Sequence, residues 1–143
     1  MRNPLQTVLD FAVARSREAE VLFKTWAPEV EDTETQALLA ELVAAERGRT
    51  EMLSRMSPEE LIGAADEIPQ MADLLVDVKA PRRVTLEAAV ELAIRRKGVT
   101  TALYERVAEL GGEACSFFRA MADEDRRAVR ALGAVAERLA ARR

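Results

Sequence analysis

The chain has 143 residues, of which 49% are hydrophobic and 32% are charged, and its net charge is −4. This length is typical of one domain with its own core, so we expect residues 1–143 to form a single domain. The acidic pI of about 5.1 argues against a general attraction to nucleic acid or to an anionic membrane. The sequence has no histidine, which removes the commonest nitrogen ligand for iron, zinc or copper and the usual general base near neutral pH.

The single cysteine, Cys115, excludes a disulfide within the chain and a Cys-x-x-Cys metal motif. We interpret it as a small apolar core residue, with a reactive thiol as the alternative. The first residues lack the basic start and apolar run of a signal peptide, and no apolar stretch is long enough to span a bilayer. These features predict a cytoplasmic location.

Apolar residues that recur in steps of three and four predict four helices, over residues 4–27, 33–56, 85–110 and 113–139. Asn3 before a proline is typical of a helix start. Thr33 and Gln36 have the spacing of a capping box. Gly111 and Gly112 end the third helix.

The connection over residues 57–84 is long enough to travel the length of a helical bundle. Ser57 and the proline after it predict a short helix up to about Gly63, and Pro69 and Pro81 argue against anything longer. A structureless linker between two domains is the alternative. We favour the bundle, because each half alone would be a helical hairpin with an exposed apolar face.

The two halves of the chain repeat each other in pattern. The corresponding residues are Ser16 and Lys97, Phe23 and Tyr104, Glu46 and Asp125, and Arg49 and Ala128. The pattern predicts an all-α four-helix bundle made of two repeated antiparallel hairpins, joined by a long crossover.

Each predicted helix carries an unusual residue on its inward face at the same level of the bundle. These residues are Ser16, Glu46 with Arg49, Lys97, and Asp125 with Ala128. An unpaired charge on a core-facing stripe is costly. A functional site, or the remains of one, is therefore expected at this level.

Four phrases carry a resemblance to a known family: residues 9–15 (Leu-Asp-Phe-Ala-Val-Ala-Arg), 86–96 (Leu-Glu-Ala-Ala-Val-Glu-Leu-Ala-Ile-Arg-Arg), 103–110 (Leu-Tyr-Glu-Arg-Val-Ala-Glu-Leu) and 117–125 (Phe-Phe-Arg-Ala-Met-Ala-Asp-Glu-Asp). From residue 9 to 132 the chain resembles the ferritin-like superfamily and, within it, the rubrerythrin-like branch. That resemblance implies a four-helix bundle, often paired as a homodimer. It also implies a di-iron site made from one Glu on each first helix and a Glu-x-x-His on each second helix.

The resemblance places a broken ligand set on this chain. Ser16 and Lys97 stand where the family has its first-helix glutamates. Glu46 keeps its carboxylate but is followed by Arg49, and Asp125 keeps a shorter one but is followed by Ala128, where the family has histidines. Arg and protonated Lys have no lone pair to give to a metal.

The charges of these residues suggest what replaces the metal. Glu46 and Asp125 are balanced by Arg49 and Lys97, so we expect a buried network of these four residues with Ser16 as a hydrogen-bonding member. Arg49 and Lys97 snorkelling to the surface is the alternative.

Two further residue groups have competing interpretations. A displaced metal site would need acids off the inward stripes, which we interpret instead as a solvated face; they are Glu18, Glu20, Glu51, Asp123 and Glu124. Tyr104 would be redox-active beside iron, but its match to Phe23 favours core packing.

These observations predict a protein that has lost di-metal binding, has no cofactor, and acts without catalysis as a scaffold, a regulator or a ligand-binding protein. The alternative is a rubrerythrin-type peroxidase or ferroxidase with two iron or manganese ions. Cysteine pairs for a rubredoxin-like electron donor are absent from the sequence. A third class, binding of nucleic acid or a membrane surface, would use the late arginines, which are interleaved with acids: Arg126, Arg127, Arg130, Arg138, Arg142 and Arg143. We expect neither partner, and leave a homodimer, an unknown protein partner or a small ligand open.

Overall fold

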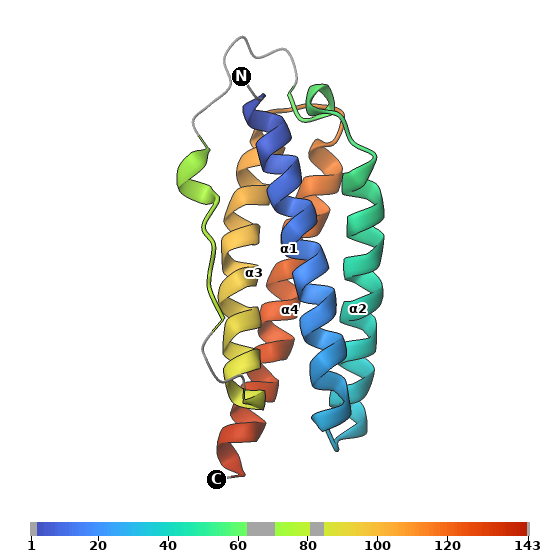
Figure 1. Cartoon of the computed structure of the whole chain (residues 1–143), viewed down its shortest axis with the longest axis vertical. Coiled ribbons are helices and arrows are strands. Elements are labelled where there is room, and N and C mark those ends of the chain that lie inside the picture. Colours follow the sequence, from blue (N-terminus) through green and yellow to red (C-terminus); the bar gives the residue numbers. More distant parts are fainter. Residues whose placement is uncertain (1–2, 63–70, 81–84, 143) are drawn as a thin grey trace.

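The computed structural model describes residues 3–62, 71–80 and 85–142. Four long helices account for most of them: α1 (Pro4–Trp26), α2 (Thr33–Ser54), α3 (Leu86–Glu109) and α4 (Cys115–Ala141). They pack as a bundle (Figure 1). The prediction of an all-α four-helix bundle is confirmed, and the predicted helix ends lie within about two residues of the observed ones, the margin within which helix ends are defined.

The helix starts follow from their capping residues. The Asn3 side chain accepts a hydrogen bond from the backbone N–H of Leu5 at 2.9 Å, as predicted. The predicted capping box at the start of α2 is wrong by one residue. Asp32, not Thr33, is the N-cap, and its carboxylate accepts the N–H of Thr35 at 3.1 Å.

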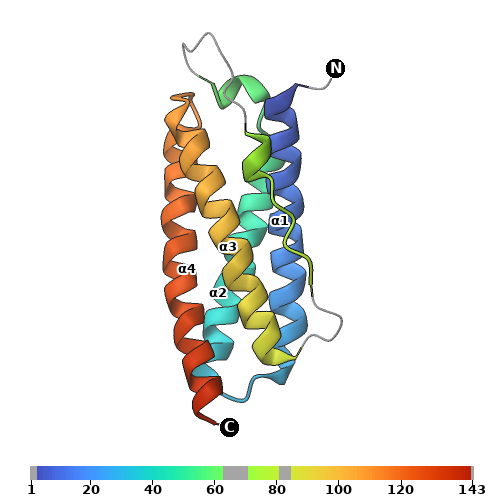
Figure 2. The same cartoon turned by 90° about the vertical axis from the view of Figure 1, so that its left-hand side faces the viewer.

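The helices form two antiparallel hairpins, α1 with α2 and α3 with α4. In Figure 1, α2 ends and α3 begins at opposite ends of the bundle, so the chain between them must return along its length. Figure 2 shows the described part of this connection running beside α3 on the side that also bears α1. The predicted crossover is therefore present, and it makes α2 and α3 run in the same direction.

The described parts of the connections contain only single turns of 3-10 helix: η1 (Ala27–Glu29), η2 (Pro58–Glu60) and η3 (Ala72–Leu74). The short helix expected after Ser57 is η2, and Gly63, Pro69 and Pro81 lie outside the described residues. Farther along, Arg15 on α1 holds Asp77 at 2.7 Å. Arg96 on α3 donates to the carbonyl of Val78 at 3.0 Å, so two helices fix the path of the crossover.

The turn between α3 and α4 packs closely on η2. Gly111 has φ of 72°, a left-handed conformation suited to a helix end. Gly112 lies so close to the η2 backbone that a Cβ there would be 2.7 Å from the backbone nitrogen of Ile62. The N–H of Ala114 donates to the carbonyl of Glu60 at 2.9 Å, which joins the end of the first hairpin to the second.

The core consists of two hydrophobic clusters. One contains Leu9, Leu53 and Phe118 near the η2 end, and the other contains Trp26 and Leu132 near the opposite end. The buried charged residues come from the middle of the helices, so they lie between these clusters. Among the described residues, no helix is long and apolar enough to cross a membrane.

Candidate functional site

The middle of the bundle holds a layer of buried polar side chains from all four helices. Their positions follow from helical spacing, because Glu46 and Arg49 are three residues apart on α2 and share one face. All are at most 6% exposed, and Asp125 is fully buried. The members are Ser16 on α1, Glu46 and Arg49 on α2, Lys97 and Thr100 on α3, and Asp125 on α4.

The four charged residues are in direct contact. The Lys97 ammonium contacts Oε1 of Glu46 and lies 3.1 Å from Oδ1 of Asp125. Nη1 of Arg49 lies 3.4 Å from that same oxygen of Glu46 and 2.5 Å from that same oxygen of Asp125. Each cation thus bridges both carboxylates, and neither extends to the surface.

The Arg49 guanidinium also connects the layer to α4. Its Nη2 donates to the backbone carbonyl of Met121 at 3.0 Å and to Oε2 of Glu124 at 3.1 Å. Burial by itself lowers the pKa of Arg49, but the nearby charges of Asp125 and Glu46 outweigh it and hold that pKa above its ordinary value. Arg49 is therefore a permanent cation at this position.

Thr100 completes the surroundings of Asp125. Its hydroxyl donates to Oδ2 of Asp125 at 2.7 Å, while Oδ1 faces Lys97 and Arg49. Both oxygens of this fully buried carboxylate therefore have partners, as a buried charge requires. Thr100 lies three residues after Lys97 on the same helix, and this spacing is the signal that could have assigned it to the site.

Ser16 has a different partner from the one expected. Its hydroxyl is hydrogen-bonded to Tyr104, and no described contact joins it to the four charges. The Tyr104 ring packs against Phe118 with centroids 5.7 Å apart. Burial, with the negative charge of Asp125, raises the pKa of Tyr104. Tyr104 therefore lies in the core, as predicted, with its hydroxyl at the edge of the polar layer.

Ala128 lies one helical turn after Asp125 and makes no polar contribution. It lines a groove of about 320 Å³ between α2 and α4, together with Leu42 and Ala45. The four charged residues of the layer also border this groove. A small side chain at this position therefore leaves space beside the ion pairs.

The remaining acids considered as ligands are dispersed. Glu18 pairs with Arg15, Glu20 with Lys24 and Asp123 with Arg126. Glu51 is exposed. Over the described ranges 3–62, 71–80 and 85–142, no three or more His, Cys, Asp or Glu side chains are grouped so that they could hold a metal ion. Two carboxylates remain at the centre, and Oε1 of Glu46 and Oδ1 of Asp125 both face protein cations.

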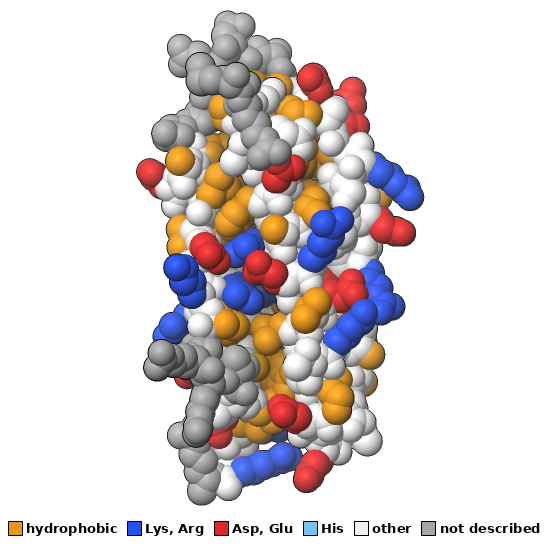
Figure 3. All heavy atoms as spheres, in the orientation of Figure 1, with side chains coloured by type: hydrophobic (Ala, Val, Ile, Leu, Met, Phe, Trp, Pro, Cys, Tyr) orange, Lys and Arg blue, Asp and Glu red, His pale blue; other side chains and the backbone are white. Residues whose placement is uncertain are grey.

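Charged side chains also gather on the surface at this level. Figure 3 shows acidic and basic groups midway along one face, with hydrophobic patches above and below them. Arg15 and Arg96, which hold the crossover, are only 14% and 19% exposed. Sequence reasoning did not assign them to the site, because their partners lie on the irregular crossover.

We compared the chain with protein-family models, with curated proteins and with solved structures, and none of the three comparisons gave a match.

Proposed function

We propose that this chain is a metal-independent relative of the ferritin-like, rubrerythrin-like bundles, and that it acts by binding a partner or a small ligand rather than by catalysis. One observation carries the proposal: Lys97 and Arg49 each contact both buried carboxylates. In the family that the sequence resembles, metal ions lie between such carboxylates. We infer that two protein cations take the place of such ions in this chain.

The charge balance supports this interpretation. Glu46 and Asp125 contribute two negative charges, and Lys97 and Arg49 contribute two positive ones. Burying two carboxylates without cations would be very costly, but this set is neutral by itself. A metal ion entering the layer would have to displace cations that are at most 6% exposed, and would leave them buried without partners.

The donor chemistry argues against a peroxidase or ferroxidase. A ferritin-like di-iron site uses four carboxylates and two imidazoles. Of the six equivalent positions only Glu46 and Asp125 offer a carboxylate, and the chain has no histidine. One oxygen of each carboxylate already accepts a hydrogen bond from a protein cation, Oε1 of Glu46 from Lys97 and Oδ1 of Asp125 from Arg49.

Activity measurements test the proposal. The protein is incubated with ferrous iron without oxygen. Oxygen or hydrogen peroxide is then added, and the oxidation of ferrous iron and the consumption of peroxide are followed. We expect both reactions to run no faster with the protein than with free iron alone, and we expect the same rates with Glu46→Ala. Turnover above that background, lost in Glu46→Ala but kept in Glu41→Ala, an exposed glutamate of the same helix, would overturn the proposal.

A further inference from the structure

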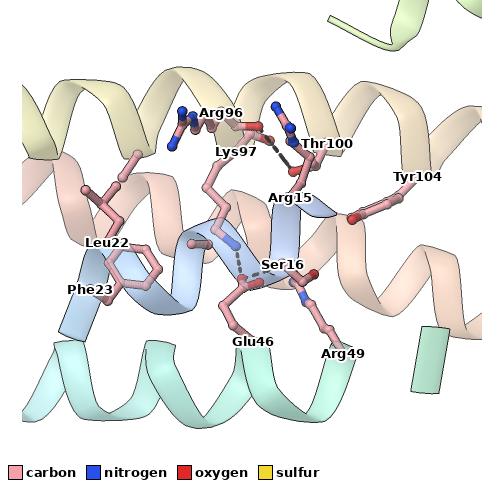
Figure 4. Close-up of a pocket in the computed structure, with 12 residues that line it drawn as sticks. Arg15, Ser16, Leu22, Phe23, Glu46, Arg49, Arg96, Lys97, Thr100 and Tyr104 are labelled. Atoms are coloured by element: carbon pink, nitrogen blue, oxygen red, sulfur yellow. Dashed lines mark hydrogen bonds and ion pairs between the residues drawn. The ribbon is translucent and has the colours of Figure 1, made fainter. Parts of the chain in front are cut away.

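A small cavity lies between α1 and α3, on the opposite side of the ion pairs from the α2–α4 groove. Figure 4 shows polar side chains from three helices pointing toward it, with Glu46 and Arg49 rising from α2 and Lys97 descending from α3. Its free volume is about 20 Å³. That is room for about one water-sized body, because a cavity needs roughly 10–15 Å³ to hold a single water.

The charged groups that line this cavity are mostly cations. The lining includes one carboxylate, Glu46, and four cations: Arg15, Arg49, Arg96 and Lys97. Lys97 pairs with the buried Glu46 and Asp125, and Arg49 pairs with these two and with Glu124, which is 45% exposed. Arg15 and Arg96 are instead paired with Glu18 and Asp77, which are 40% and 57% exposed. Solvent screens the exposed carboxylate of Asp77, whereas Oε2 of Glu18, 3.8 Å from Nη2 of Arg96, is buried. The cavity lining itself carries four cations and one carboxylate.

Two hydrogen-bond donors among these cations have no partner. The Nε atoms of Arg15 and Arg49 are both buried, and neither makes a hydrogen bond within the described part of the chain. Arg49 is 94% buried, since only 6% of it is exposed. An ammonium has three N–H groups, and the carboxylates of Glu46 and Asp125 account for two of those on Lys97. Buried donors without acceptors are rare and costly, so these groups point to an acceptor that occupies the cavity.

We propose that the α1–α3 cavity binds a small monovalent anion of about the size of chloride. Such an ion accepts hydrogen bonds from several directions and needs no acceptor itself, which matches a lining with unpaired N–H groups. The free volume of about 20 Å³ favours an ion of this size over sulfate, phosphate and larger organic anions. This inference rests on the proposed metal-free centre, because Lys97 and Arg49 line the cavity while they bridge the carboxylates.

Asp77 carries a competing negative charge beside Arg15, one of the residues that line the cavity. Its Oδ1 lies 2.7 Å from Nη1 of Arg15. The hydrogen bond from Arg15 lowers the pKa of Asp77, so this carboxylate stays ionised at neutral pH. Removing the charge should therefore strengthen anion binding, whereas shortening Arg15 should weaken it.

The test measures the melting temperature while sodium gluconate is replaced by sodium chloride or bromide at constant ionic strength. We expect a saturable rise in melting temperature with either halide. Arg15→Gln should weaken the apparent affinity by at least about tenfold, the size of a hydrogen bond to a charged group. Asp77→Asn should strengthen it by up to about fivefold, the size of one screened surface charge. Asp123→Asn, which removes an exposed acid 2.7 Å from Arg126, should leave it unchanged.

Crystals soaked in bromide provide the second measurement. An anomalous peak between α1 and α3 supports the inference. Equal melting temperatures in bromide and gluconate, together with no bromide in the cavity, would overturn the anion site alone if the protein also takes up no metal. Uptake of iron that depends on Glu46 would overturn both this inference and the proposed metal-free centre.

Discussion

Nη1 of Arg49 on α2 lies 2.5 Å from Oδ1 of Asp125 on α4, although 76 positions separate the two residues in the sequence. Lys97 on α3 contacts the same oxygen at 3.1 Å. The layer therefore joins the first hairpin to the second at mid-height, between the two hydrophobic clusters. The net stabilisation by this layer is limited, because burying four charges is costly. Removing one of the four residues leaves its partner buried and unpaired, which is strongly destabilising.

Lys97→Met should destabilise the protein by about 3–5 kcal/mol, because it leaves a buried carboxylate charge without its partner. Lys24→Met is the matched control. Lys24 pairs with Glu20 at 2.7 Å but is 46% exposed, so its loss should cost less than about 1 kcal/mol. Urea unfolding measures both. Equal destabilisation by the two substitutions would show that Lys97 is not in a buried pair.

Removing both members of one ion pair should destabilise the protein less than removing one member. In the double variant Glu46→Leu, Lys97→Met, Arg49 and Asp125 still balance each other at 2.5 Å. We expect this variant to recover a large part of the loss seen in Lys97→Met, because replacing a buried ion pair by apolar groups is often close to neutral. A strictly additive double variant would refute the pairing.

The tyrosine gives a pH prediction. Burial raises the pKa of Tyr104 above the value of about 10 for an exposed tyrosine. The folded state therefore holds this proton more tightly than the unfolded state. Its contribution to stability is constant below about pH 10 and is lost as the pH rises further.

The chain has one tyrosine, so the ultraviolet absorbance of phenolate reports Tyr104 alone. Phenolate should appear only together with the loss of helical circular dichroism. Ionisation near pH 10 in a protein that is still fully helical would contradict the buried position.

Gly112→Ala should destabilise the protein by about 1–3 kcal/mol, the cost of forcing a group into a packed site. The added Cβ would lie 2.5 Å from the carbonyl carbon of Leu61, and the backbone of η2 would have to move. Gly98→Ala is the control, because no neighbouring atom lies within 4 Å of a Cβ there. This second change should stabilise α3 by about 0.5–1 kcal/mol. Thermal unfolding of both variants measures these changes in stability. A Gly112→Ala variant as stable as the original protein would contradict the close packing.

The helices could be predicted from the sequence because their signals are local. Apolar steps of three and four fix the buried face of each helix, and Asn3 and Gly111 mark ends by their own backbone chemistry. The start of α2 was missed by one residue because Asp32 and Thr33 are both good N-caps. Choosing between them requires knowing which side chain reaches the N–H of Thr35.

The level of the charged layer along the bundle could also be predicted, because Glu46 and Lys97 occupy core positions in the helical pattern. The finer contacts were not. Ser16 is hydrogen-bonded to Tyr104 because its short side chain comes within hydrogen-bonding distance of that hydroxyl. Helical spacing predicts which face a side chain is on, but not which neighbour it contacts. The contacts of Arg15 and Arg96 depend on the path of the crossover, which has no periodic pattern to predict it.

The most direct test of the central claim, that protein cations take the place of metal ions, is the metal content of the protein. The chain is incubated without oxygen with ferrous iron or manganese, desalted, and analysed by mass spectrometry. We predict almost no bound metal, because Lys97 and Arg49 already balance both buried carboxylates. About two metal ions per chain, lost in Glu46→Ala, would contradict the account and restore a di-metal site.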